Sequence, residues 1–326
     1  MEAVRSLLFI VFSILIIGKG SDWLTDSLIP IARKLGVSGS FVGLILVSVA
    51  VSLPEVLIAI YATIKGYPII SYGIVLGSIA CNIGLMTGLS ALVSPLKVNS
   101  RIILRDGIFS IVVPILVFAS SQGGRLTRLQ GFAFLILFIP YVVNVYLHEK
   151  LSTTAEKKEN LKEIVIELEL AGFEFGKLKP GWLSFALGLV LLLVSAQLFG
   201  NQLITLAKQF GISELLIGLT IGAIGPSVPN IITAYQATRK GMGEIAVSET
   251  LGSNIFTLLV SLGVLAMLSP IAIPQRWLNF DLPAMIFMSF LLLFFIITKK
   301  TISKTEGLIL LGSYLSILFI QVILNK

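Results

Sequence analysis

Long apolar segments recur from one end of the chain to the other. A helix that crosses a bilayer needs roughly 20 apolar residues, and ten segments of this 326-residue sequence meet that requirement. Hydrophobic residues make up 56% of the chain, charged residues only 13%, and the mean hydropathy is +0.99. These values predict an all-α, polytopic membrane protein. The ten predicted transmembrane helices are 6–33, 39–63, 70–95, 104–122, 128–147, 181–208, 212–238, 244–270, 279–298 and 304–324.

The distribution of positive charge predicts how these spans are oriented. The net charge of +7 could suggest a nucleic-acid ligand, but the Lys and Arg residues gather in alternate loops. With the N-terminus outside, sixteen basic residues fall in cytoplasmic loops and seven fall outside. Because cytoplasmic loops carry the excess of basic residues, both termini are predicted to be external, in the plasma membrane. The first apolar stretch runs into "GKGSDWL" (18–24) and is expected to remain as a span rather than act as a cleaved signal peptide.

One charged segment divides the chain into two halves of five spans each. Residues 148–180 are rich in Lys and Glu and are interpreted as a solvated cytoplasmic linker between residues 1–147 and 181–326. The single histidine, His148, does not belong to a metal-binding motif. The single cysteine, Cys81, excludes an intramolecular disulfide and a thiolate cluster, and is expected to be a packing residue.

The two halves contain an internal repeat. Residues 35–92 align without a gap with residues 210–267, at a constant offset of 175. The copies lie five spans apart, an odd number, so they are expected to enter the membrane from opposite sides. Inverted repeats with interrupted helices are typical of secondary transporters, which bind their substrates near the midplane. The shared landmarks include Gly36/Gly211, Ser52/Ser227, Pro54/Pro229, Thr63/Thr238, Lys65/Lys240 and Gly66/Gly241.

The stretch "VSLPEVLIAIYA" (51–62) places a carboxylate inside a span. Pro54 cannot donate a backbone hydrogen bond and clashes with the preceding turn, so it is predicted to break the helix and free carbonyl oxygens. Glu55 lies at this predicted break, and carbonyl, hydroxyl and carboxylate oxygens together suit Ca²⁺, Na⁺ or similar cations. The alternative is a kinked helix whose Glu55 is paired with Lys19 or kept protonated.

Two polar stripes are predicted to form the other walls of a site. Ser78 and Asn82 are four residues apart and share one helix face. In the second half, Glu249, Ser253 and Thr257 also step by four along one face. The alternative for a Ser/Asn stripe alone is hydrogen bonding between helices of a membrane bundle.

These motifs resemble those of the calcium/cation antiporter superfamily, the sodium/calcium exchangers and their prokaryotic relatives. The resemblance covers both repeats and the first span, and so nearly the whole plan of ten spans. It implies exchange of Ca²⁺ for Na⁺, or for H⁺ in some branches, with ions held between broken second and seventh spans and the flanking third and eighth. The motifs that carry it are "SLPE" (52–55), "LGSIACN" (76–82), "SVPN" (227–230), "LGSNIFT" (251–257) and "GSDWL" (20–24).

The resemblance also implies a set of ligands and shows where this chain departs from the family. Asn230 stands where the second repeat usually has an essential glutamate, and Glu249 stands at a position that is asparagine in relatives. A site with Glu55 and Asn230 offers one negative charge. Glu249 could add a second charge from one helical turn away. Alternatively, Glu249 lies at the membrane interface and is paired with Lys or Arg. Further departures are Val51, Ile74, Pro226, Gln197 and Thr257. The complete set of candidate metal ligands is Glu55, Ser52, Ser78, Asn82, Ser227, Asn230, Glu249, Ser253 and Thr257.

Three functions are compatible with the sequence. The first is a secondary active antiporter that exchanges Ca²⁺ or another cation for Na⁺ or H⁺ by alternating access. The second is an exchanger with altered selectivity for monovalent cations and protons, and the third is a membrane scaffold or sensor of the same fold that has lost transport. An enzyme is not expected, because no intramembrane nucleophile–base pair or clustered metal motif occurs. No cofactor or nucleic-acid partner is expected; inorganic cations and the lipid bilayer are the expected partners, and the oligomeric state stays open.

Overall fold

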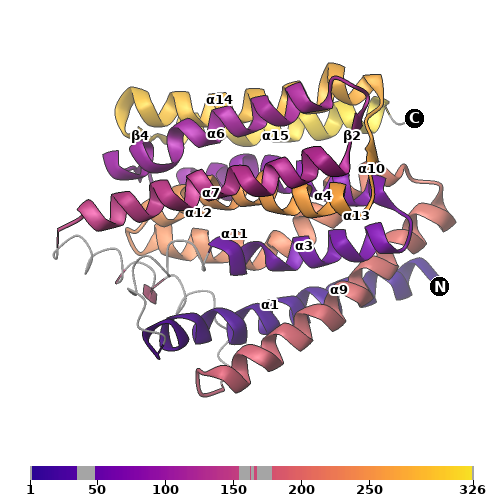
Figure 1. Ribbon diagram of the computed structural model, residues 1–326, viewed down its shortest axis with the longest axis horizontal. Helices are drawn as coiled ribbons and strands as arrows, with labels where there is room; N and C mark the ends of the chain where they lie inside the picture. Colours follow the sequence, from indigo (N-terminus) through magenta and orange to yellow (C-terminus); the bar gives the residue numbers. More distant parts are fainter. Residues whose placement is uncertain (1, 35–47, 154–161, 163–164, 167–177, 325–326) are drawn as a thin grey trace.

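Helices of membrane-spanning length make up most of this computed structural model, which describes residues 2–34, 48–153, 162, 165–166 and 178–324. Within these residues, nine helices are long and apolar enough to cross a bilayer, and a shorter apolar helix, α3, covers Ser48–Ile64. The helices lie roughly side by side (Figure 1). The chain is therefore a multi-pass integral membrane protein. The start of the predicted second span, 39–63, lies outside the described residues.

The first half contains five helical segments in chain order. The third of these changes its geometry in the middle, where a π-helical segment, η2, separates two α-helices. The last, α7, continues to Leu151 and so includes the first residues of the predicted linker, most of which lies outside the described residues. The elements are α1 Glu2–Lys34, α3 Ser48–Ile64, α4 Pro68–Cys81, η2 Asn82–Thr87, α5 Gly88–Val93, α6 Ser100–Ser121 and α7 Arg128–Leu151.

The second half repeats this order with similar lengths. Two of its spans also contain π-helical segments in the middle, and a third begins with one. The predicted span 244–270 closely matches the helix from Glu244 to Leu268. The elements are α9 Trp182–Phe210, α10 Glu214–Ile217, η3 Gly218–Gly222, α11 Ala223–Arg239, α12 Glu244–Phe256, η4 Thr257–Ser261, α13 Leu262–Leu268, η5 Trp277–Asp281, α14 Leu282–Lys299 and α15 Lys304–Leu324.

Two short antiparallel ribbons connect loops of the two halves. Strand β1, Leu96–Lys97, pairs with β4, Thr301–Ile302, and β2, Arg125–Leu126, pairs with β3, Ile271–Ala272. The ribbons lie at opposite ends of the bundle, as the positions of β4 and β2 in Figure 1 show. Each end of the bundle is therefore closed by backbone hydrogen bonds between the first half and the second.

Helices α3 and α11 end in the same way. Gly66 and Gly241 have φ angles of +88° and +84°, in the left-handed region that favours glycine. Their amides bond back to the carbonyls of Thr63 and Thr238, each at 3.0 Å, in the manner of a glycine C-cap. This explains why both residue pairs recur at the offset of 175.

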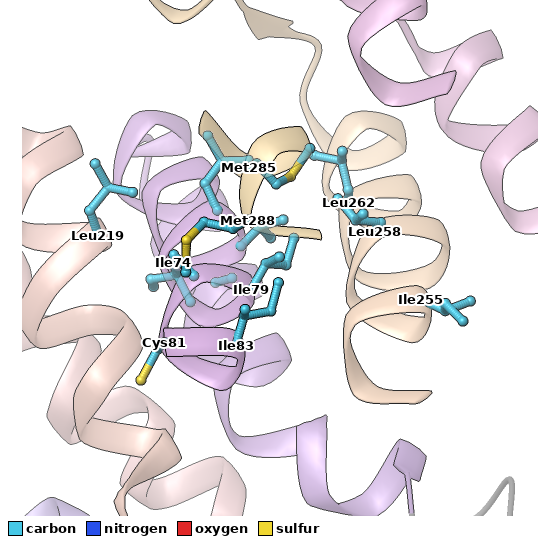
Figure 2. Packing of buried hydrophobic residues seen from close by; sticks show 14 of the residues in the cluster. Ile74, Ile79, Cys81, Ile83, Leu219, Ile255, Leu258, Leu262, Met285 and Met288 are labelled. Atoms are coloured by element: carbon cyan, nitrogen blue, oxygen red, sulfur yellow. The ribbon is translucent and has the colours of Figure 1, made fainter. Parts of the chain in front are cut away.

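Helices α4 and α12 lie at the centre of the bundle. In the span Pro68–Val93, 89% of the most apolar stretch is buried, and in Glu244–Leu268 the value is 78%, against 22% for α7 and for α15. The outer helices expose large apolar side chains such as Leu129 and Phe319, which suit contact with lipid. Figure 2 shows Ile79 and Ile83 on one side of α4 and η2, with Cys81 on the other. Buried apolar residues thus pack against this central helix on more than one side.

Candidate cation-binding site

Helices α3 and α11 continue through their prolines, so the prediction of a helix break at Pro54 is wrong for the described residues. Pro54 lies inside α3, and Pro226 and Pro229 lie inside α11. A proline removes only its own donor, and membrane helices tolerate this loss when nearby polar groups bond to the backbone. The deviation from α geometry occurs instead in η3, the π-helical segment that leads into α11.

A close backbone approach positions this part of the site. A Cβ atom on Gly218 of η3 would lie 2.4 Å from the carbonyl oxygen of Ile70 and 2.8 Å from the Cα of Gly73. No larger residue fits at such a distance, so the glycines let η3 pack directly against α4. The seventh span is thereby held against the helix that carries Ser78 and Asn82.

The two polar stripes lie where α-helices change into π-helices. Asn82 is the first residue of η2 and Thr257 is the first residue of η4, and these two positions are related by the repeat offset of 175. A π-helical turn adds a residue to the turn and is frequent at functional sites. Each stripe therefore ends at a local change of helix geometry near the middle of its span.

Three of the candidate ligands form one hydrogen-bonded cluster. The Ser52 hydroxyl donates to Oγ of Ser253 at 3.1 Å. The Asn82 amide donates from Nδ2 to Oγ of Ser253 at 3.1 Å and to Oδ1 of Asn254 at 3.0 Å. All four residues are buried, and they come from α3, η2 and α12. Side chains from three spans and both halves thus meet at one point in the core.

Glu55 is placed beside this cluster. It follows Ser52 by three residues on α3, so the two side chains share one helix face. Glu55 is 2% exposed, and its Oε2 atom has no hydrogen-bond partner among the described residues. Lys19, the alternative partner predicted from the sequence, lies 3.8 Å from Asp22 on its own helix. A buried carboxylate oxygen of this kind is suited to accept a cation or a proton.

Two further candidate hydroxyls are buried in the same way. Oγ of Ser78 and Oγ1 of Thr257 have no hydrogen-bond partner within the part of the chain that the structure describes. Ser78 precedes Asn82 by one turn, and Thr257 follows Ser253 by one turn. Together with Glu55 Oε2, they provide buried oxygen atoms that accept no hydrogen bond from the described residues. Such hard oxygen ligands suit Na⁺ and Ca²⁺.

The remaining candidates have different surroundings. Asn230 donates from Nδ2 to the carbonyl oxygen of Val51 at 3.3 Å, which links α11 to α3 next to Pro54. The Ser227 hydroxyl donates within its own helix, to the carbonyl of Ala223 at 2.8 Å. Glu249 is buried on α12, one turn before Ser253. Gln197 is exposed on α9.

Sequence reasoning missed part of the cluster. Asn254 accepts a hydrogen bond from Asn82, and Thr250 donates to the carbonyl of Asn82 at 3.2 Å and pairs with Thr87 at 2.7 Å. Asn254 belongs to the "GSNI" motif that carried the resemblance, and this membership was the available signal. Thr250 and Thr87 gave none, because their contact depends on how η2 and α12 pack.

The candidate site is built from oxygen-bearing groups and one clear carboxylate. No group of three or more His, Cys, Asp or Glu residues that could hold a metal ion occurs among the described residues. Hydroxyls and amides therefore supply most of the donor atoms.

Comparison with known proteins identifies the family. The sequence profile of the sodium/calcium exchanger protein family matches residues 5–147 and 180–323. The chain belongs to the sodium/calcium exchanger family. This confirms the resemblance inferred from the repeat motifs.

Relatives of this exchanger share most of its length. The sodium/calcium exchanger MaX1 of Methanosarcina acetivorans is 30% identical, and the alignment covers 95% of this chain and 97% of MaX1. The inner membrane protein YrbG of Escherichia coli is also 30% identical, over 80% of this chain and 79% of YrbG. As a member of this family, the exchanger is a cation transporter and not an enzyme.

A solved exchanger shares the fold. The structure of the sodium-calcium exchanger NCX_Mj soaked with 2.5 mM Na⁺ and 0.1 mM Sr²⁺ matches with a TM-score of 0.65 and 25% sequence identity. The match covers 96% of this chain and 97% of that chain. The helical arrangement of this exchanger is therefore an established fold for a cation exchanger.

Proposed function

We propose that this protein exchanges Ca²⁺ or another cation for Na⁺ or H⁺ by alternating access. The cation is held between α3 and α11 on one side and two ion-lining helices, α4 with η2 and α12 with η4, on the other. The observation that carries this proposal is the cluster of Ser52, Ser253 and Asn82 beside Oε2 of Glu55, an atom without a hydrogen-bond partner among the described residues. It brings a carboxylate together with hydroxyl and amide groups from both halves of the chain.

Matching features at the offset of 175 support an arrangement of ten spans in two inverted halves. Helices α3 and α11 end at Ile64 and Arg239, which are related by this offset. Strands β1 and β3 are related in the same way. The first half is assigned to residues 1–147 and the second to 181–326, with the two repeats at 35–92 and 210–267. The profile match is interrupted between residues 147 and 180, which supports the assignment of 148–180 as a linker.

The orientation in this proposal follows from charge. The excess of Lys and Arg in alternate loops favours a cytoplasmic linker and two external termini. The membrane assigned by this reasoning is the plasma membrane. With this orientation, transport would exchange cations between the cytoplasm and the exterior.

A second candidate function rests on the missing carboxylate at position 230. The position that pairs with Glu55 in the repeat is Asn230, whose amide donates to a backbone carbonyl. One negative charge attracts a divalent cation less strongly than two, and the difference in a low-dielectric site amounts to kcal/mol. A monovalent-cation or proton exchanger would need only Glu55 as its ionisable group. A transport-deficient scaffold is the remaining alternative.

A flux assay separates these functions. The purified protein is reconstituted into vesicles, and Ca²⁺, Na⁺ and internal pH are followed under opposed gradients. The proposal predicts Ca²⁺ movement that depends on an opposed Na⁺ or H⁺ gradient. Na⁺ movement coupled to pH without Ca²⁺ movement would favour the second function, and no gradient-dependent movement of any cation would favour the scaffold.

A further inference from the structure

Two buried aspartates outside the candidate site occupy equivalent positions in the two halves. Asp106 on α6 and Asp281 at the end of η5 are separated by 175 residues, the repeat offset (281 − 106 = 175). Asp106 is 0% exposed and Asp281 is 5% exposed. A carboxylate inside a membrane protein is costly and marks a functional position by default. Each half nevertheless has a buried aspartate at the equivalent position.

Asp106 connects three helices. Arg105 donates to it from Nε at 2.8 Å and from Nη2 at 2.5 Å, and the Tyr141 hydroxyl of α7 donates to it at 3.2 Å. Nη2 of Arg105 also donates to Oγ of Ser248 on α12 at 3.1 Å. Since Ser248 lies five residues before Ser253, this cluster holds the beginning of the ion-lining helix α12.

The segment η5, which ends at Asp281, connects the three equivalent helices. The Oδ1 atom of Asp281 accepts a hydrogen bond from Nε2 of Gln321 on α15, which in turn accepts one from Arg276 at 2.8 Å. Trp277, one turn before Asp281, stacks on Tyr72 of α4 with ring centroids 4.5 Å apart and planes 7° apart. Tyr72 lies six residues before Ser78, so this cluster holds the beginning of the ion-lining helix α4.

The two clusters lie at opposite ends of the bundle. Asp106 lies near the start of α6, the helix that follows β1 in the chain, and Asp281 lies directly before α14, in the segment that follows β3. Figure 1 shows β4 and β2 at opposite ends. In each cluster an aspartate and a helix of one half are joined to the ion-lining helix of the other half. The two clusters therefore join equivalent pairs of helices, although they do so through different side chains.

We propose that the clusters around Asp106 and Asp281 are matched anchors, each of which positions the ion-lining helix of the opposite half. The Asp106 cluster fixes α12 through the contact of Arg105 with Ser248, and the Asp281 cluster fixes α4 through Trp277, which lies one turn before Asp281 and stacks on Tyr72. This inference rests on the proposed function, because α4 and α12 bear the candidate ligands. A shift of either helix by about 0.5 Å would disturb ligand geometry, so each anchor affects binding through its own helix.

The test uses variants that cut a connection without leaving a buried charge unpaired. Removing Asp106 itself would strand Arg105 and could prevent folding. Ser248→Ala cuts the connection to α12, and Tyr72→Leu cuts the connection to α4. Hydrogen exchange of the full-length protein is expected to be faster in α12 but unchanged in α4 for Ser248→Ala, and the reverse for Tyr72→Leu. Faster exchange in both helices for both variants, or in neither, would overturn the proposal.

Cation affinity provides the readout that a purely structural role would not move. Each variant should weaken Ca²⁺ or Na⁺ binding by about three- to tenfold, the range expected for losing one interaction. In double-mutant cycles on cation affinity, the effect of Ser248→Ala should depend on Thr257→Ala, and that of Tyr72→Leu on Ser78→Ala. For the pairs Ser248→Ala with Ser78→Ala and Tyr72→Leu with Thr257→Ala, the two fold-changes in affinity should simply multiply. Equal coupling in all four pairs, or a lower melting temperature with unchanged affinity, contradicts positioning. If the wild-type protein bound neither cation, the proposed function would fail, while the exchange pattern would still decide whether the anchors hold separate helices.

Discussion

The side-chain amide of Asn230 donates a hydrogen bond to the carbonyl oxygen of Val51 at 3.3 Å, joining α11 to α3 across 179 residues of sequence. A carboxylate at position 230 could not make this bond, because an ionised carboxylate has no proton to donate. The amide therefore has two effects at the proposed site. It removes one negative charge, and it occupies a backbone carbonyl that could otherwise face a cation.

Replacing Asn230 should strengthen divalent binding. Asn230→Glu adds a charge at the position that pairs with Glu55 in the repeat and releases the carbonyl of Val51. We expect Ca²⁺ to bind about tenfold more tightly or better, as measured by titration calorimetry, because charge–charge attraction is strong in a buried site. Asn279→Glu, which adds the same charge at an exposed position, is the control. Unchanged Ca²⁺ affinity in a well-folded Asn230→Glu protein would show that the site's charge lies elsewhere.

Glu55 should be indispensable for transport. Glu55→Gln keeps the size of the side chain but removes the charge beside Ser52 and Ser253. We expect cation flux in vesicles to fall by about 100-fold or more, since several kcal/mol of cation binding is lost. Glu214→Gln, which makes the same change on α10 outside the proposed site, should retain normal flux. Normal flux in well-folded Glu55→Gln would remove this residue from the mechanism.

Glu249 should contribute less than Glu55. It is buried on α12 one turn before Ser253, about 6 Å along the helix axis from it. Glu249→Gln should therefore weaken Ca²⁺ binding by about three- to tenfold, because it acts on the cation from a greater distance. Calorimetry on the same preparation as Glu55→Gln gives the comparison. Complete loss of binding in Glu249→Gln would instead make Glu249 a direct ligand.

The linker should be cytoplasmic. Cysteine introduced at Lys157 is expected to react with a membrane-impermeant thiol reagent only after the cells are permeabilised, because sixteen of the loop Lys and Arg residues lie on that side against seven outside. The unsubstituted protein, whose only thiol is the buried Cys81, provides the background. Labelling at Lys157 in intact cells would reverse the orientation.

The sequence predicted the spans well and the local helix geometry poorly. Hydropathy alone placed the span 304–324 where α15 covers Lys304–Leu324, because an apolar segment of this length has one stable state in a bilayer. The effect of Pro54 could not be predicted in the same way. Whether a proline breaks a helix depends on which groups bond to the nearby backbone, and here the donor to Val51 comes from α11.

The candidate site shows the same division. The repeat and the two polar stripes identified Ser52, Asn82 and Ser253, which the structure brings into one cluster. The π-helical segments that begin at Asn82 and Thr257 carry no sequence signature, because tertiary packing decides where a helix widens. Thr250 was missed for the same reason, since its partners lie on the neighbouring span.

The most direct test of the account is to locate the cation. Crystals of the protein soaked with Sr²⁺, which stands in for Ca²⁺, would show the ion by its anomalous scattering. The account predicts one peak between α3 and the ion-lining helices, at roughly 2.5 Å from an oxygen of Glu55 and from hydroxyl oxygens of the cluster. In crystals of Glu55→Gln that peak should disappear. A peak that lies away from Glu55, or that persists in Glu55→Gln, would contradict the proposed site.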